Sequence, residues 1–140
     1  MSVKCHEIIS AMEILAPKNL AESWDNVGLM LGSQNDNINK ILFALDCSEA
    51  VIDEAIEIGA NMIITHHPFI FKALKTLDFD TPIGKKIKKA IKNNINIYSA
   101  HTNLDIAEGG TNSTLSNILE LNNVTGLFRT GESSFLGKIG

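Results

Sequence analysis

Residues 41–68 read ILFALDCSEAVIDEAIEIGANMIITHHP, and this stretch decides the fold class. Residues 41–45 and 62–65 are short apolar runs of the kind that form buried strands. Between them, Ser48 is a favourable N-cap for a helix and Gly59 is placed to end it. A strand, a helix of about eleven residues and a second strand predict a βαβ unit, whose strands pair in parallel with a right-handed crossover.

The same alternation of helices and strands runs along the rest of the chain. The pattern predicts a helix ended by Pro17, a strand over residues 27–31, a helix starting at Thr81-Pro82, a buried strand over residues 95–99 and a last helix through Leu115. Residues 105–110 are expected to form a loop, and residues 135–140 begin a strand with nothing after it to pair with. We therefore predict one α/β domain over residues 1–140, a mostly parallel sheet flanked by helices and apparently truncated.

The composition excludes several classes of protein. The chain has 140 residues, of which 44% are hydrophobic and 20% charged, as expected for a globular domain. A net charge of -4 argues against nucleic acid as a main partner, and the lack of a long apolar run argues against a membrane span. The two cysteines, Cys5 and Cys47, are isolated in the sequence, which fits a reducing cytosol. We expect a cytoplasmic protein.

Histidines gather at the ends of the predicted strands. Three of the four histidines are His66 and His67, which follow the strand over residues 62–65, and His101, which follows the next strand. Asp105 lies four residues beyond His101. Parallel strands deliver their carboxyl ends to one edge of the sheet, and imidazole with carboxylate is a ligand set for zinc, iron, manganese, cobalt or nickel. The sequence therefore predicts a metal site at this edge.

The adjacent histidines indicate two ions. Neighbouring side chains of a strand point to opposite faces, so His66 and His67 cannot share one ion while the strand continues. Pro68 restrains the chain as it leaves the sheet. One imidazole per ion with Asp105 as a bridge fits better, which is a two-metal site with ions roughly 3.5–4 Å apart. His101 is either a further ligand or a residue that orients Asp105 or a water.

Purely structural roles for the same residues stay open. The histidines can simply form hydrogen bonds in a metal-free domain. Asp46 is expected to fix the following loop, Trp24 to pack beneath the sheet edge, and Asp25 to belong to a turn. The lysines from Lys85 to Lys92 are expected to be the solvated face of a helix, and Gly109-Gly110 gives only a weak signal for an anion site.

Three motifs resemble the NIF-three-like family, whose members are often labelled GTP cyclohydrolase I type 2 homologues. The matching residues are the segments WDNVGL at 24–29, ITHHP at 64–68 and SAHTNLD at 99–105. The resemblance implies an α/β fold, a dinuclear metal centre with His66, His67 and Asp105 as its N-terminal ligands, and a homohexameric ring. It also implies a further histidine and glutamate from a C-terminal motif. No histidine follows His101, so residues 1–140 match the N-terminal portion of a longer family member.

Two functions from different classes follow. Two divalent ions bridged by a carboxylate favour hydrolysis, because one ion activates water and the other polarises the electrophile. We therefore expect a metal-dependent hydrolase acting on a nucleotide or other phosphorylated small molecule. The alternative is a ring-forming binding or scaffold protein with a structural or sensing metal centre.

Overall fold

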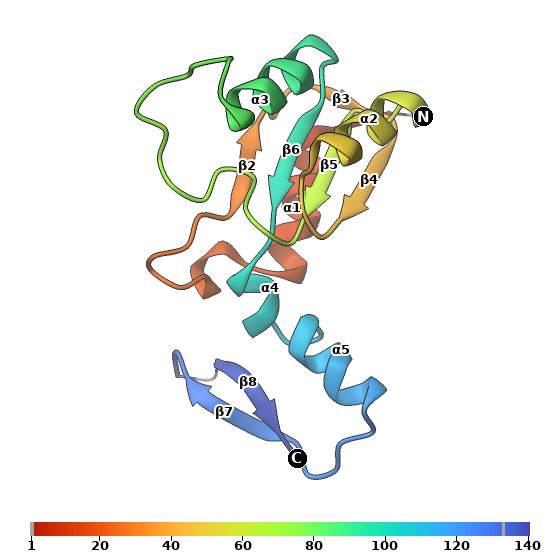
Figure 1. Ribbon diagram of the computed structural model, residues 1–140. Coiled ribbons are helices and arrows are strands. Elements are labelled where there is room, and N and C mark those ends of the chain that lie inside the picture. The colour runs from red at the N-terminus through yellow and green to blue at the C-terminus, as the bar shows by residue number, and fades with distance from the viewer. Residues whose placement is uncertain (1, 133) are drawn as a thin grey trace.

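The computed structural model describes residues 2–132 and 134–140 and contains short helices alternating with short strands (Figure 1). The helices are α1 (Cys5–Leu15), the 3-10 turn η1 (Lys18–Leu20), α2 (Glu49–Ile58), α3 (Pro82–Lys92), α4 (Thr102–Ile106) and α5 (Thr111–Ile118). The strands are β1 (Val3–Lys4), β2 (Gly28–Leu31), β3 (Asn37–Ile38), β4 (Ile41–Ala44), β5 (Met62–Thr65), β6 (Asn96–Ser99), β7 (Thr125–Arg129) and β8 (Phe135–Ile139).

The central sheet has the strand order β2-β6-β5-β4. Strands β4, β5 and β6 are parallel, and β2 runs antiparallel to β6. The predicted βαβ unit is confirmed, with β4, α2 and β5 as its parts. The three parallel strands point toward the edge where α4 begins, so the residues that follow them meet there (Figure 1).

Helices cover both faces of this sheet. Because side chains alternate along a strand, Ile63 and Ile97 pack in a core with residues of α2 and α3, such as Ile52. Met62 and Tyr98 point the other way and pack against α1. Figure 1 shows α2 and α3 on one face of the sheet and α1 on the other. The predicted α/β architecture of a mostly parallel sheet flanked by helices is confirmed.

The predicted ends of two helices are confirmed. The Ser48 hydroxyl accepts the backbone N–H of Val51 at 3.2 Å and caps α2, which ends where Gly59 takes a φ of 70°. The Thr81 hydroxyl accepts the backbone N–H of Gly84 at 3.1 Å and caps α3.

The expectation of a buried strand at residues 41–45 is wrong. Strand β4 was expected to be buried, but it is the edge of the sheet and its Phe43 side chain is 68% exposed. Strand β4 has a neighbouring strand on one side only. The predicted last helix forms as α5, and its Ile118 side chain is also exposed, at 70%.

The C-terminal part also differs from expectation. Residues 135–139 form β8, which pairs antiparallel with the preceding strand β7, an element that the sequence pattern did not predict. Asp105, placed in a loop by the sequence analysis, lies in α4. Figure 1 shows α5 and the β7–β8 hairpin below the central sheet, joined to it through α4.

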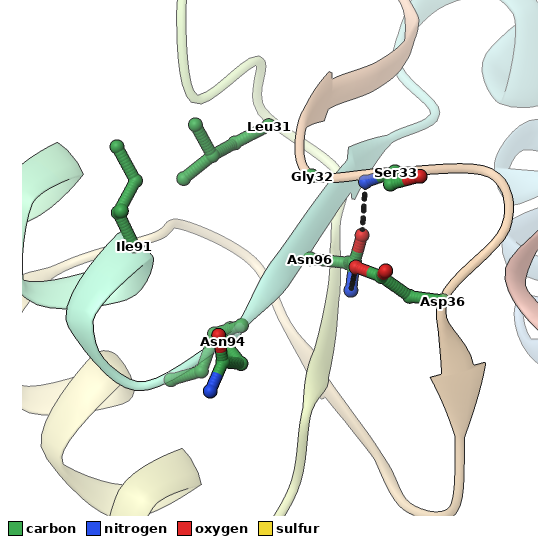
Figure 2. Close-up of a pocket in the computed structure, with 8 residues that line it drawn as sticks. Leu31, Gly32, Ser33, Asp36, Ile91, Asn94 and Asn96 are labelled. Carbon is green, nitrogen blue, oxygen red and sulfur yellow. Dashed lines mark hydrogen bonds between the residues drawn. The ribbon is translucent and has the colours of Figure 1, made fainter.

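A loop at the amino end of β6 is fixed by the buried Asn96 side chain. Its Oδ1 accepts the Ser33 N–H at 2.8 Å, and its Nδ2 donates to Asp36 Oδ2 at 3.0 Å (Figure 2). Gly32 has a φ of 112°, and a Cβ atom there would lie 1.9 Å from Asn96 Oδ1. These residues line a cavity of about 210 Å³, in which the Asn96 side chain is paired with Ser33 and Asp36. Because Asn96 begins β6, the cavity lies at the opposite end of the strand from His101.

Among residues 2–132 and 134–140, no helix is long and apolar enough to cross a membrane.

Candidate metal centre

Three imidazoles converge where β5 and β6 end. His66 and His67 follow β5, and His101 follows β6. One ring nitrogen from each histidine lies within 4.8 Å of the others. The ring centroid of His66 is 5.2 Å from that of His67 and 5.1 Å from that of His101. The parallel strands therefore bring together three of the residues that the sequence analysis placed at this edge.

The end of β5 explains why two adjacent histidines face the same space. The strand ends at Thr65, whose hydroxyl donates to the His67 carbonyl at 2.8 Å. Just beyond Thr65, the N–H groups of His66 and His67 donate to the carbonyls of Ala44 and Leu45 at 3.3 and 2.9 Å. Two consecutive donors depart from the regular pairing of a parallel strand. The alternation that separates neighbouring side chains does not extend past Thr65. Both rings can thus approach one ion, which the sequence argument excluded only for a continuing strand.

Each imidazole is held through its Nδ1 atom. The acceptors are the Ala100 carbonyl for His66 at 3.1 Å, Asp46 Oδ1 for His67 at 2.8 Å and Asp25 Oδ1 for His101 at 3.0 Å. Because a carbonyl or carboxylate oxygen accepts, each Nδ1 donates, and in a neutral imidazole the lone pair is then on Nε2. Carboxylate or carbonyl contacts of this kind orient histidines that bind metals.

Asp25 is a buried anchor that the sequence analysis assigned to a turn. Its side chain is 0% exposed and, besides the His101 contact, accepts the Thr102 N–H at 3.1 Å and hydroxyl at 2.5 Å. Burial raises the pKa of the Asp25 carboxyl, but the hydrogen bonds from His101, Thr102 and Asn26 outweigh burial and lower it below its usual value. Asp25 is therefore a carboxylate near neutral pH, able to hold the His101 ring.

Asn103 fixes the backbone on the other side of His101. Its Oδ1 accepts the His101 N–H at 2.9 Å, and its Nδ2 donates to the Ala16 carbonyl at 2.7 Å. Asn103 is fully buried, so this link ties the start of α4 to the end of α1. This role of Asn103 is not predicted from the sequence, where its position within the SAHTNLD motif is the signal that marks it.

Asp105 adjoins the imidazoles. One turn of α4 separates it from His101, whose carbonyl accepts the Asp105 N–H at 3.0 Å. This turn places Asp105 Oδ1 3.6 Å from His66 Nε2, and both side chains are partly buried. That distance is too long for a hydrogen bond and leaves the two atoms free to approach a common ligand.

Asp46 and Trp24 also border the cluster. Asp46, expected to fix the following loop, holds the His67 ring. Trp24, expected to pack beneath the sheet edge, is 58% exposed. Its ring meets the rings of Phe71 and His101 edge-on, with centroids 6.1 and 6.3 Å away, so it forms a rim of the site and not a part of the core.

The two cysteines do not supply ligands. Cys5 and Cys47 are free and buried. Burial raises the pKa of the Cys47 thiol to about 11 and also raises that of Cys5. Near neutral pH the donors at the cluster are therefore nitrogen and oxygen atoms, a set that suits borderline divalent ions.

Two of the lysines of α3 contact other parts of the protein, and Lys85, Lys88 and Lys92 are exposed. Lys86 Nζ donates to the Cys47 carbonyl at 3.0 Å, and Lys89 forms ion pairs with Glu49 and Asp53. They are consistent with the expected solvated face of a helix.

The packing of α4 against α5 explains the glycine at position 110. A Cβ atom there would lie 1.9 Å from the Leu104 carbonyl oxygen, so close approach of α4 and α5 requires glycine at this position.

The fold and the site define an α/β protein with a cluster of imidazoles and carboxylates, compatible with metal binding, at the carboxyl edge of its sheet. Residues 3–139 match the family model described as Duf34/NIF3 (NGG1p interacting factor 3), and the chain belongs to this family. The family resemblance seen in the sequence motifs is confirmed.

Curated relatives carry the name GTP cyclohydrolase 1 type 2 homolog. The Clostridium perfringens protein is 54% identical over 120 residues, which are 86% of this chain and 46% of that protein. The Bacillus subtilis protein is 46% identical over 120 residues, which are 86% of this chain and 32% of that protein. The chain thus spans less than half the length of these relatives.

Solved structures show the same fold. A Bacillus cereus protein related to NIF3 matches with a TM-score of 0.84 and 49% identity, over 89% of this chain and 34% of that one. Reduced HcgD from Methanocaldococcus jannaschii matches with a TM-score of 0.87 and 39% identity, over 94% of this chain and 52% of that one.

Proposed function

We propose that this chain carries the ligands of a dinuclear centre in a metal-dependent hydrolase that acts on a nucleotide or another phosphorylated small molecule. The ligands are His66, His67 and Asp105, with His101 at the same site. The observation that carries the proposal is the convergence of three imidazoles, each held by an oxygen acceptor, beside a carboxylate.

The donor set fits divalent ions. The Nδ1 contacts leave each Nε2 free, and Asp105 lies 3.6 Å from His66 Nε2. Imidazole and carboxylate together can bind zinc, iron, manganese, cobalt or nickel, so the type of donor does not identify the metal. The family resemblance implies one more histidine and a glutamate, and no histidine follows His101 in this chain. We therefore expect a second ion to bind residues 1–140 weakly.

The chain's own residues would position the reactants. When bound, divalent ions supply Lewis-acid chemistry that activates water and polarises an electrophile. Asp46 and Asp25 hold His67 and His101 at fixed orientations, which reduces the reorganisation needed when ions bind. The partly buried His66 and Asp105 form the inner wall of the site, and the exposed Trp24 forms its rim.

The substrate class rests on two supports. The curated relatives are named as homologues of a GTP cyclohydrolase, an activity in which water opens a purine ring. Positive charge from divalent ions also attracts phosphate groups. We propose that the protein acts in the cytoplasm, since buried free thiols fit a reducing compartment.

Exposed apolar surface supports the alternative function, a ring-forming binding or scaffold protein with a structural or sensing metal centre. Phe43 on the sheet edge and Ile118 on α5 are among the exposed apolar side chains. Unpaired edges and apolar patches favour association between chains. We propose a homo-oligomer, with the hexameric ring of the family resemblance as its form.

One experiment separates the two functions. The chain is loaded in turn with each of the five candidate metals and incubated with GTP and with phosphomonoester and phosphodiester substrates, before and after chelation. Turnover that is lost on chelation and in His66→Ala, but kept in His6→Ala, supports the hydrolase. His6 is the matched control because it lies in α1, with its Nδ1 3.3 Å from the Gln34 carbonyl. Two bound ions per chain without turnover of any substrate favour the scaffold.

A further inference from the structure

Two aromatic side chains lie exposed beside the imidazoles. Trp24 is 58% exposed and Phe71 is 46% exposed, and their ring centroids are 6.1 Å apart. The Trp24 ring also lies 6.3 Å from the ring of His101. Leaving large aromatic rings in water forgoes the free energy that their burial would supply. Accessible aromatic rings next to convergent polar groups are the composition of a ligand-binding site.

The backbone around Trp24 is fixed to the residue that follows His101. The Asp25 N–H donates to the Glu22 carbonyl at 2.9 Å and closes a turn that contains Trp24. The Glu22 N–H donates to the Thr102 hydroxyl at 3.0 Å, and the Asp25 carboxylate accepts the Thr102 N–H at 3.1 Å. Because both ends of the turn are tied down, less conformational freedom is lost when a ligand contacts Trp24.

Phe71 is held to the same turn from a distant part of the chain. It lies in the long loop between β5 and α3 (Figure 1). The carbonyl of the preceding residue, Ile70, accepts a hydrogen bond from Asn26 Nδ2 at 2.6 Å. Asn26 is only two residues from Trp24, so one short segment positions both aromatic rings.

The angle between the two rings suits a planar ligand. Their planes are inclined at 69°. A planar ring that stacks on Trp24 therefore meets the plane of Phe71 at about the same angle, in the edge-to-face range. Offset stacking and edge-to-face contact are the two arrangements that aromatic rings prefer. A bare phosphate or a flexible aliphatic chain gains neither contact.

We infer that Trp24 and Phe71 are specificity-determining residues that hold the base of a nucleotide by stacking at the rim of the site. This inference rests on the proposed function and deepens it, because it names the part of the substrate that the chain recognises without metal. Every base has a π-face, so the two rings favour nucleotides over other phosphorylated compounds without selecting one base.

The test measures the binding of guanosine, GMP and ribose 5-phosphate to the 140-residue chain by calorimetry, with Zn²⁺ and after chelation. Trp24→Leu and Phe71→Leu keep an apolar side chain and remove the π-face, whereas Trp24→Phe keeps a smaller aromatic ring. Phe128→Leu is the matched control, because Phe128 is 65% exposed but lies in β7. Circular dichroism checks the fold of every variant.

The wild type should bind guanosine and GMP, and guanosine binding should persist after chelation. Trp24→Leu and Phe71→Leu should weaken the binding of both compounds roughly 5–100-fold, the range expected for loss of one stacked ring. Trp24→Phe should lose less affinity than Trp24→Leu, and Phe128→Leu should match the wild type. Ribose 5-phosphate should bind only with Zn²⁺, with the same affinity in every variant.

Three outcomes overturn the inference: a wild type that binds no guanosine, leucine variants that keep the wild-type affinity for guanosine, or an equal loss of affinity for ribose 5-phosphate, which would assign the rings to the sugar. If ribose 5-phosphate binding is still lost on chelation, the proposed function stands in each case. Guanosine binding that depends on both rings, in a chain whose binding of GMP and ribose 5-phosphate ignores Zn²⁺, supports the stacking and contradicts the proposed function.

Discussion

The Nδ1 atom of His101 lies 3.0 Å from Oδ1 of Asp25, although 76 residues separate the two in the chain. This contact links the loop before β2 to the segment after β6, the two strands that pair at one side of the sheet. Asp25 also accepts the N–H and hydroxyl of Thr102, so one buried carboxylate fixes both the ring of His101 and the start of α4.

Replacing Asp25 by asparagine should weaken metal binding and the fold together. Asparagine keeps the shape of the side chain but loses the charge that accepts four hydrogen bonds, which should cost about 1–3 kcal/mol of unfolding free energy. The affinity for metal should fall roughly 10–100-fold, because the His101 ring at the proposed site loses the carboxylate that orients it. Urea unfolding and metal titration measure the two effects. An unchanged metal affinity would show that Asp25 only supports α4.

Replacing Gly32 by alanine should destabilise the protein more than replacing Gly59 by alanine. Both glycines have positive φ, but a Cβ atom at Gly32 would lie 1.9 Å from Asn96 Oδ1, whereas one at Gly59 meets nothing within 4 Å. The Gly59 variant should lose about 1–2 kcal/mol from backbone strain alone. The Gly32 variant should lose more, because the Asn96 hydrogen bonds must also rearrange (Figure 2). Equal losses of unfolding free energy in the two variants would show that the loop containing Gly32 rearranges without added strain.

The sequence was sufficient for the elements whose signals are local. The apolar run at residues 62–65 identifies β5, whose four residues are all buried. Ser48 and Gly59 mark the two ends of α2, because their caps depend on neighbouring backbone groups. Strand β7 was missed because its residues are largely exposed and carry no regular alternation. Its pairing with β8 depends on the turn that brings the two strands together in the fold.

The site was predictable at the level of residue type and strand edge. The convergence of His66, His67 and His101 follows from parallel strands ending together. Their orientation did not follow, because it depends on where β5 ends and on acceptors far away in sequence. Asp25 is the clearest case, since a carboxylate next to a tryptophan gives no sign of a histidine 76 residues later.

The Cys47 thiol should make stability fall at alkaline pH. Burial raises its pKa from 9.0 to about 11, and the nearby Lys86 opposes part of that shift. A raised pKa means that the folded state holds the proton more tightly, so the contribution is complete below pH 9 and is lost as pH rises through about 11. The wild type should therefore lose more unfolding free energy between pH 8 and pH 10.5 than Cys47→Ala. Identical pH profiles in urea unfolding would contradict a buried, protonated thiol.

Replacing Phe43 by aspartate should reduce self-association. Phe43 is 68% exposed on the edge strand β4 and lines an apolar groove of about 360 Å³ with Val3 and Ile8. A charge in this groove opposes burial against another chain. Light scattering should show a smaller mean mass for Phe43→Asp than for the wild type. Leu77→Asp is the matched control, because Leu77 is also an exposed apolar residue but lies in the loop before α3. A mass that is unchanged in Phe43→Asp places the association surface elsewhere.

Trp24 should report metal binding without any added label. It is the single tryptophan of the chain, and its ring centroid lies 6.3 Å from that of His101. Ions with partly filled d shells, such as Co²⁺ and Ni²⁺, quench an excited indole at this range, whereas Zn²⁺ lacks the electronic states to do so. Fluorescence should therefore fall strongly and saturably with Co²⁺, and added Zn²⁺ should restore it by displacement. His66→Ala should abolish the saturable quenching while circular dichroism stays unchanged, because the His66 ring lies outside both hydrophobic core clusters. Saturable quenching that persists in His66→Ala would place the bound ion at another site near Trp24.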